Sequence, residues 1–122
     1  MTTERDLQEN AEEFLREAGR AMDNQSYNAA VALYFKAIAV LTDLFILKKE
    51  GMIPSNHAER FRLLQRKYPE IYRIHDKDFP IYQDSYKTKL TKEYAEVLAY
   101  DTRKLIKITG IDLTGKGIHK KP

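Results

Sequence analysis

The chain has 122 residues and no cysteine, and its 21 Lys and Arg against 18 Asp and Glu give a formal net charge of +3. This length fits one domain with its own core and excludes two independent domains. The absence of cysteine excludes a disulfide scaffold, a thiolate zinc site and cysteine catalysis, and it fits a reducing compartment such as the cytoplasm. The small net charge excludes the strongly basic class of nucleic-acid-binding proteins.

The first segment, residues 4–23, predicts an amphipathic helix with one apolar face. Residues 1–23 hold seven acidic residues and three arginines, the opposite of a signal or transit peptide. A turn follows at 23–26, after which Ser26 or Asn28 is expected to cap the next helix. The apolar residues that define the helix recur at steps of three and four: Leu7, Ala11, Phe14, Leu15, Ala18, Ala21 and Met22.

The second segment, residues 28–50, predicts a long helix that other helices cover on several sides. Between residues 29 and 47, 16 of 19 residues are apolar. Lys36 and Asp43 interrupt this run, and two charges in mid-span favour a buried helix of a soluble protein over a membrane span. They lie two turns apart, on a face shared with Ala32 and Ala39. This face is either a helix–helix or subunit contact with an ion pair, or a solvent-exposed stripe.

The third segment begins at Asn56, which forms a capping-box pattern with Glu59, and its helix ends before Pro69. For residues 69–81 we expect one turn of helix and then a loop, because the HDKD run at 75–78 and Pro80 interrupt the apolar spacing. The HDKD run has the side-chain types of a cation site. Adjacent side chains in a loop seldom converge, so this loop is predicted to be solvated and to bind no metal.

From Tyr82 to Ile108 the apolar residues again recur at helical spacing. This pattern is one helix or, alternatively, two helices with a break at 88–91 and Thr91 as the new cap. The GxxxxGK-like spacing from Gly110 to Lys116 lacks the Ser or Thr and the helix of a phosphate-binding loop. Residues 111–122 are predicted to be a mobile basic tail. The sequence therefore predicts one all-α domain at 1–110, an up-and-down bundle of four to five helices.

Charge is unevenly distributed along the chain. Residues 48–67 hold six basic and two acidic residues, a local charge of +4, whereas residues 1–23 have a charge of −4. The basic stretch is the best candidate for a polyanion-binding surface. Six tyrosines between residues 68 and 100 could stack on bases if exposed, although tyrosines at helical spacing are also typical of a core. The same polarity fits contacts between complementary protein surfaces.

The order of these signals resembles a HEPN domain (higher eukaryotes and prokaryotes nucleotide-binding) over roughly residues 5–109. The resemblance implies a helical bundle that commonly dimerises, that is encoded in many prokaryotes beside a small nucleotidyltransferase, and that cuts RNA without metal in its active branch. Active members carry an Arg, four to six residues, and then a His at the start of a late helix. The stretches that match are YNAA at 27–30, LYFKA at 33–37, KEG at 49–51, HAERFRLL at 57–64 and YQDSY at 82–86.

The nuclease motif of that family is missing from this sequence. Eight residues separate Arg66 from His75, one separates Arg73 from His75, and residues 82–91 contain neither Arg nor His. Metal-free RNA cleavage needs a general acid or base of near-neutral pKa beside a cation that stabilises the transition state. We therefore expect no nuclease activity, and no catalytic residue, metal or cofactor is assigned.

The sequence thus predicts a non-catalytic HEPN-like module that forms a homodimer through residues 28–50, with a contribution from the last helix. It is expected to bind a nucleotide, an RNA or a protein partner such as a small nucleotidyltransferase, and no membrane. One alternative is a metal-independent ribonuclease in which His57 or His75 acts with a nearby arginine. Another is a regulatory partner of a nucleotidyltransferase without its own nucleotide site. The candidate nucleotide or RNA contacts are Lys36, Arg60, Tyr82 and Tyr86.

Overall fold

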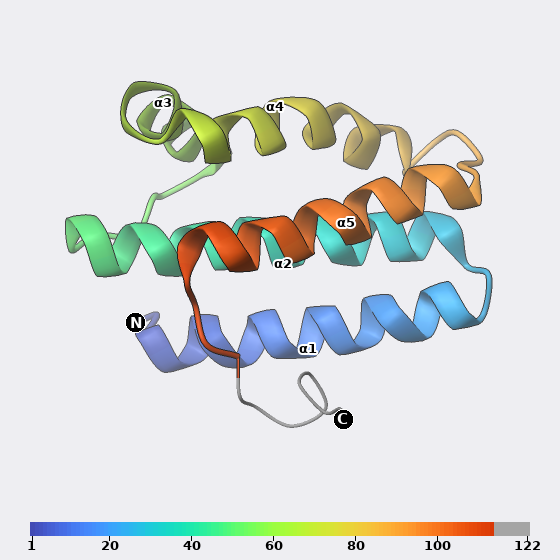
Figure 1. Ribbon diagram of the computed structural model, residues 1–122, viewed down its shortest axis with the longest axis horizontal. Helices are drawn as coiled ribbons and strands as arrows, with labels where there is room; N and C mark the ends of the chain where they lie inside the picture. Colours follow the sequence, from blue (N-terminus) through green and yellow to red (C-terminus); the bar gives the residue numbers. More distant parts are fainter. Residues whose placement is uncertain (114–122) are drawn as a thin grey trace.

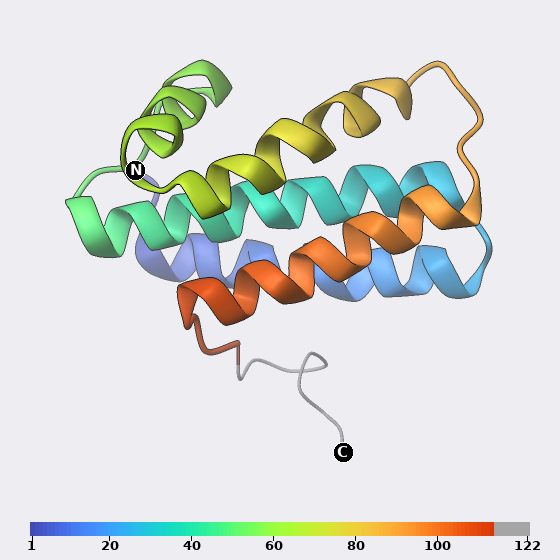
Figure 2. The same cartoon turned by 45° about the horizontal axis from the view of Figure 1, so that its top comes forward.

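The computed structural model describes residues 1–113, and over this range the chain is a bundle of five helices without a strand. The central helix, α2, packs against α1, α4 and α5 (Figure 1). The short helix α3 lies near the C-terminal end of α2 and packs against α4 (Figure 2). These elements confirm the predicted all-α bundle. Their bounds are α1 Glu4–Asp23, α2 Tyr27–Glu50, α3 His57–Lys67, α4 Pro69–Asp84 and α5 Lys92–Thr109.

The apolar run at 29–47 forms the middle of α2 and supplies more residues to the core than any other helix. By length and composition α2 is the one helix among residues 1–113 that could cross a membrane, and 61% of its apolar window is buried inside the bundle. Apolar residues occupy most of its circumference because three helices pack around it. Its fully buried apolar residues are Ala30, Val31, Ala37, Ile38, Leu41, Leu44 and Ile46.

Helix α4 differs from the predicted turn and loop, because it continues without interruption from Pro69 to Asp84. Pro69 stands in the first turn, where a missing N–H removes no helical hydrogen bond. Pro80 lacks the N–H that would bond the carbonyl of Asp76, but both residues are exposed, so water can bond this carbonyl. The buried residues of α4 are Ile71, Ile74, His75 and Asp78. Two of them are polar, so the spacing of apolar residues alone does not reveal this buried face.

The predicted solvated loop at 75–78 is therefore wrong. His75 and Asp78 are 0% exposed, and Asp78 faces Asp101 of α5, which is 2% exposed. The Lys77 ammonium lies 3.0 Å from Asp101 Oδ2. Burial, followed by the neighbouring Asp101 carboxylate, raises the pKa of the Asp78 carboxyl to about 8. At neutral pH Asp78 is protonated and can donate its proton to Asp101.

The alternative of two helices with Thr91 as the new cap is confirmed, but the break begins at residue 85 and not at 88. Helix α4 ends at Asp84, and Thr91 is the N-cap of α5, with extended backbone angles but no side-chain cap bond. The predicted cap at the start of α2 is absent: Ser26 is the N-cap, and its side chain bonds no amide of the first turn. The Asn28 side chain bonds the α4–α5 loop instead.

The described chain continues for three residues past Gly110, which ends α5 in the left-handed conformation with φ of 68°. Ile111 and Leu113 are buried in the core, and the Gln8 side chain donates a hydrogen bond to the Asp112 carbonyl of this segment. The start of the predicted tail thus packs against the bundle. The rest of the predicted tail, residues 114–122, lies outside the described residues, as do Lys116 and His119.

Candidate functional site

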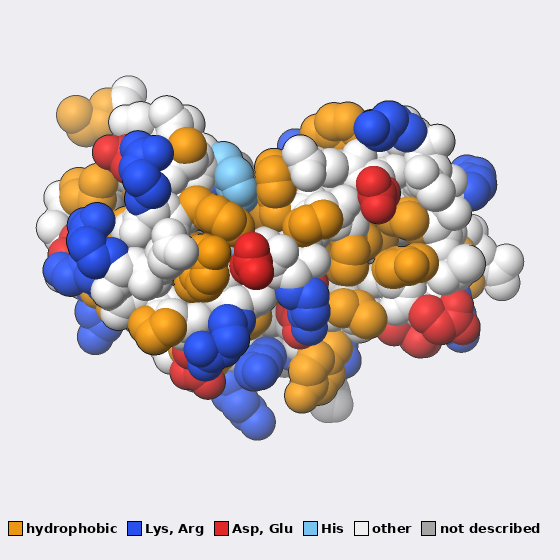
Figure 3. Space-filling view, turned by 90° about the horizontal axis from the view of Figure 1, so that it is seen from above, with side chains coloured by type: hydrophobic (Ala, Val, Ile, Leu, Met, Phe, Trp, Pro, Cys, Tyr) orange, Lys and Arg blue, Asp and Glu red, His pale blue; other side chains and the backbone are white. Residues whose placement is uncertain are grey.

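A hollow of about 320 Å³ lies over the middle of α2, between α1 on one side and α3 and α4 on the other. In Figure 3 a notch between two lobes of the molecule has apolar side chains and a histidine on its walls. The hollow draws side chains from four helices. Its lining consists of Phe14 of α1, Phe35, Lys36, Ala39 and Val40 of α2, His57 and Arg60 of α3, and Phe79 and Tyr82 of α4.

The wall of the hollow is a cluster of stacked rings. Phe35 is 3% exposed and stacks on Tyr82, with ring centroids 4.8 Å apart and planes 23° apart. His57 stacks on Phe79, with centroids 3.9 Å apart and planes 20° apart. Because these contacts join α2, α3 and α4, they fix the position of the partly exposed ring faces of His57, Phe79 and Tyr82. The result is a preformed aromatic surface.

Arg60 is held in place by Asp43. Its Nε and Nη2 atoms each donate a hydrogen bond of 2.8 Å to one carboxylate oxygen of Asp43, and both side chains are only 11–12% exposed. A bidentate pair of this kind fixes the plane of the guanidinium. Of the two alternatives for the face with Lys36 and Asp43, the helix–helix contact with an ion pair therefore holds at Asp43, whose partner is Arg60 of α3, whereas Lys36 is exposed. The pair joins α2 to α3 at the edge of the hollow.

Two imidazoles lie beside this pair. Arg60 Nη1 is 3.4 Å from His57 Nδ1, and because Arg can only donate, Nδ1 accepts and the proton of the neutral ring is on Nε2. Burial, followed by the charge of Arg60, lowers the pKa of His57. Burial is also the main cause that lowers the pKa of His75 to about 3. His75 Nε2 lies 2.8 Å from the Thr42 hydroxyl inside the core, so both rings are neutral at pH 7.

The remaining predicted contacts lie at the end of the hollow nearest the α4–α5 loop. Lys36 is exposed, and its Nζ is 5.9 Å from the centroid of the Tyr82 ring. The Tyr86 hydroxyl donates a hydrogen bond of 3.0 Å to the Tyr82 hydroxyl, and this bond is the main cause that raises the pKa of Tyr86. Tyr86 is 72% exposed and contacts Tyr82 edge to face, with ring centroids 5.5 Å apart.

The structure thus brings the four predicted contact residues together. Lys36, Arg60 and Tyr82 line one hollow, and Tyr86 packs on Tyr82 at its outer end. Sequence reasoning missed Phe79, which it placed in a loop, and it did not assign Asp43 as the partner of Arg60. The signal for the α3 wall was present: His57 and Arg60 are three residues apart after the Asn56 cap, so they lie on one face of that helix.

No group of three or more His, Asp or Glu residues that could hold a metal ion occurs within residues 1–113. Comparisons with protein-family models, with curated proteins and with solved structures give no match for this chain. The assignment of a function therefore rests on the geometry of the hollow. That geometry combines exposed ring faces, one exposed ammonium and a guanidinium whose orientation is fixed.

Proposed function

We propose that the chain is a non-catalytic HEPN-like module that binds a nucleotide or a single-stranded RNA in the hollow over α2. The observation that supports this function is the presence of accessible aromatic faces and two cationic side chains in one cavity. Aromatic faces stack on nucleobases of any sequence, and Lys and Arg neutralise phosphate. The volume is at the lower end of the range of about 300–1,000 Å³ typical of small-molecule sites, so one nucleoside unit fits best.

In this arrangement Tyr82 and Tyr86 provide the stacking surface and Lys36 provides the attraction for phosphate. Lys36 is exposed beside the Tyr82 ring, so a base on Tyr82 places its phosphate within reach of the ammonium. Arg60 contributes direction more than charge, because Asp43 neutralises most of its field. Its guanidinium is held in a fixed plane at the wall of the hollow, where it can recognise the edge of a base.

The test is titration of the protein with ATP and with a short single-stranded oligouridylate while amide chemical shifts are recorded. Tyr82→Ala is expected to weaken binding by about tenfold or more, because stacking on an aromatic side chain is worth about 1–3 kcal/mol per base. Lys36→Gln should weaken binding and reduce its salt dependence. Lys104→Gln, at an exposed position of α5, is the matched control. Absence of shifts around the hollow with both probes would contradict the proposal.

The proposal includes a homodimer formed through α2. Part of the apolar window of α2 stays accessible in the monomer outside the lining of the hollow, including the half-buried Leu33, and a symmetric contact would cover this part of the helix. Sedimentation at micromolar concentration is expected to give twice the monomer mass of 14.3 kDa. A monomer over the whole concentration range would contradict the dimer but not the nucleotide site.

The proposal also includes the binding of a protein partner such as a small nucleotidyltransferase. The acidic exposed face of α1 supports it, since Glu9 and Glu13 are exposed and no basic helix covers them within residues 1–113. Co-purification with a nucleotidyltransferase encoded beside the gene tests this interaction. Loss of the complex on charge reversal of Glu9 and Glu13 is expected, whereas an unchanged complex would contradict this surface.

A second candidate function is metal-independent cleavage of RNA. It is favoured by one observation, the neutral His57 imidazole beside the Arg60 guanidinium in the same hollow. His75 is fully buried and is not available to a ligand. Incubation with structured and single-stranded RNA, with His57→Ala as the comparison, distinguishes the two functions. Cleavage that His57→Ala abolishes would favour the ribonuclease, and absence of cleavage would favour the binding module.

A further inference from the structure

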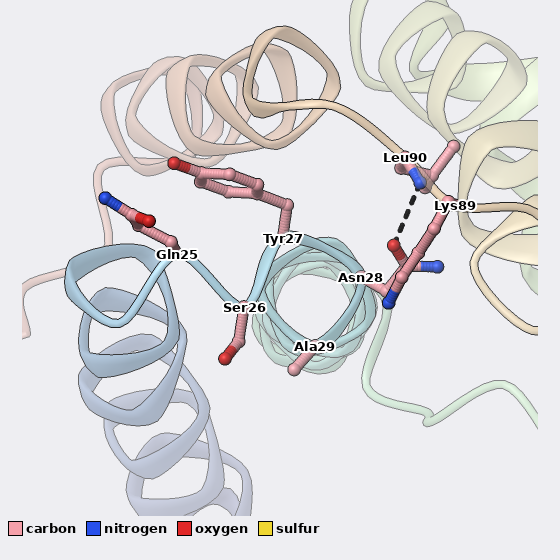
Figure 4. A pocket seen from close by; sticks show the side chains of 7 residues that line it. All are labelled: Gln25, Ser26, Tyr27, Asn28, Ala29, Lys89 and Leu90. Atoms are coloured by element: carbon pink, nitrogen blue, oxygen red, sulfur yellow. Dashed lines mark hydrogen bonds between the residues drawn. The ribbon is translucent and has the colours of Figure 1, made fainter.

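One side chain, Asn28 in the first turn of α2, holds the whole α4–α5 loop. Its Nδ2 donates hydrogen bonds to the carbonyls of Ser85 and Thr88, at 2.9 and 2.7 Å. Its Oδ1 accepts a hydrogen bond of 2.9 Å from the Leu90 amide. Figure 4 shows Asn28 projecting from α2 toward Leu90, beside the pocket that the start of α2 forms with the loop. The three bonds therefore attach both ends of the loop to α2.

The pattern of bonds requires an asparagine at this position. Both N–H donors of the amide are used on carbonyls, and its oxygen is used on an N–H, so the amide has one orientation only. An aspartate of the same shape would set a carboxylate against two carbonyl oxygens. Such a side chain would repel the loop at Ser85 and Thr88 and keep only the bond with Leu90.

The loop that Asn28 holds carries Tyr86 to the candidate site. Tyr86 is 72% exposed, and its ring contacts one other aromatic residue within residues 1–113, Tyr82. Its position therefore depends on the backbone at 84–88, where the amides of Lys87 and Thr88 bond the Asp84 carbonyl. The carbonyl of Ser85, directly before Tyr86, is one of the two that Asn28 bonds. Asn28 is thus connected to Tyr82 and the hollow through Tyr86.

We propose that Asn28 is a positioning residue of the nucleotide site: it fixes the α4–α5 loop so that Tyr86 extends the stacking surface of Tyr82 before a ligand arrives. This inference rests on the proposed function of the hollow. Asn28 would thus contribute to the affinity for the nucleotide although it does not line the hollow. The physical reason is preorganisation, because a loop that is already ordered loses less conformational entropy on binding.

The test compares the affinity of wild type, Asn28→Asp, Asn28→Ala, Tyr86→Ala and the two double variants for ATP and for a short oligouridylate. Asn28→Asp is expected to weaken binding by about tenfold, and Asn28→Ala, which removes the bonds without adding repulsion, by a smaller factor. In the Tyr86→Ala background neither change should weaken binding further, because the side chain that the loop positions is gone. Asn10→Asp adds the same charge at an exposed position of α1 and should bind as wild type does.

Binding is measured well below each melting temperature, so that loss of folded protein does not count as loss of affinity. If Asn28→Asp is not folded, the cycle of Asn28→Ala with Tyr86→Ala decides the question alone. Wild-type affinity in the Asn28 variants, or a loss that adds fully to that of Tyr86→Ala, would overturn the positioning role and leave the proposed function intact. If wild type binds neither probe, the proposed function itself fails and this inference fails with it.

Discussion

Asp43 and Arg60 show how much one buried ion pair contributes to the shape of a site. The two side chains are nearly buried and joined by two hydrogen bonds of 2.8 Å, so neither charge has much contact with water. Desolvation offsets a large part of their mutual attraction, and the intact pair contributes less to stability than its geometry suggests. Its main effect is to orient Arg60 and to hold His57 against Phe79 at the wall of the hollow.

Breaking this pair from one side is expected to be strongly destabilising. Arg60→Met leaves the Asp43 carboxylate unpaired in a nearly buried position, which should lower the free energy of unfolding by about 3 kcal/mol in urea denaturation. The double variant Asp43→Leu, Arg60→Met removes both charges and should recover most of that loss. Arg5→Met, in the exposed pair with Glu9, is the control with little measurable effect. Equal losses in the single and double variants would argue against this account.

Helix α4 shows where sequence reasoning reached its limit. The bounds of α1 and α2, the Asn56 cap of α3 and the end of α5 at Gly110 follow from local patterns of apolar spacing and capping chemistry. Helix α4 does not, because its buried face includes His75 and Asp78. Inside the bundle His75 contacts the Thr42 hydroxyl of α2, and Asp78 lies beside Asp101 of α5. Such partners are distant in sequence, so no local pattern predicts them.

The contact between α4 and α5 is expected to weaken as the pH rises. Asp78 keeps its proton in the folded chain up to about pH 8, whereas an unfolded chain loses it near the ordinary value of 3.8. Between these two pH values the free energy of unfolding therefore falls by up to about 1.4 kcal/mol per pH unit. The stability that the neutral carboxyl contributes is lost as the pH rises through 8. Thermal unfolding from pH 6.5 to 8.5 should show a falling melting temperature.

Asp78→Asn is the matched variant for this measurement, because its amide is neutral at every pH and can still donate to Asp101. Its melting temperature should change less with pH than that of wild type. The range above pH 6.5 is chosen because His75 acts in the opposite direction below it: its folded pKa is lowered, so its contribution is lost as the pH falls. Parallel pH profiles for wild type and Asp78→Asn would show that Asp78 is ionised in the folded chain.

For the molecule as a whole, the site follows from one asymmetry in how the helices surround α2. Helices α1, α4 and α5 all pack on α2, whereas α3 packs against α4 and is joined to α2 by the Arg60–Asp43 and Lys67–Glu50 ion pairs. Between α1 and the α3–α4 pair a strip of α2 stays open, and the hollow lies over this strip. The sequence predicted the contact residues separately, but only the arrangement of four helices places them around one cavity.

The position of α3 has a consequence for motion. An element with few tertiary contacts opens by itself at a lower free energy than the rest of the molecule unfolds. The amides of α3 should therefore exchange with solvent deuterium by local opening, and those of the central residues of α2 only by global unfolding. Uniform exchange rates in the two helices would contradict this difference. Helix α3 carries His57 and Arg60, so the part of the wall that opens most easily is the part that presents the guanidinium to a ligand. A ligand that contacts Arg60 should therefore slow the hydrogen exchange of α3 before that of the other helices.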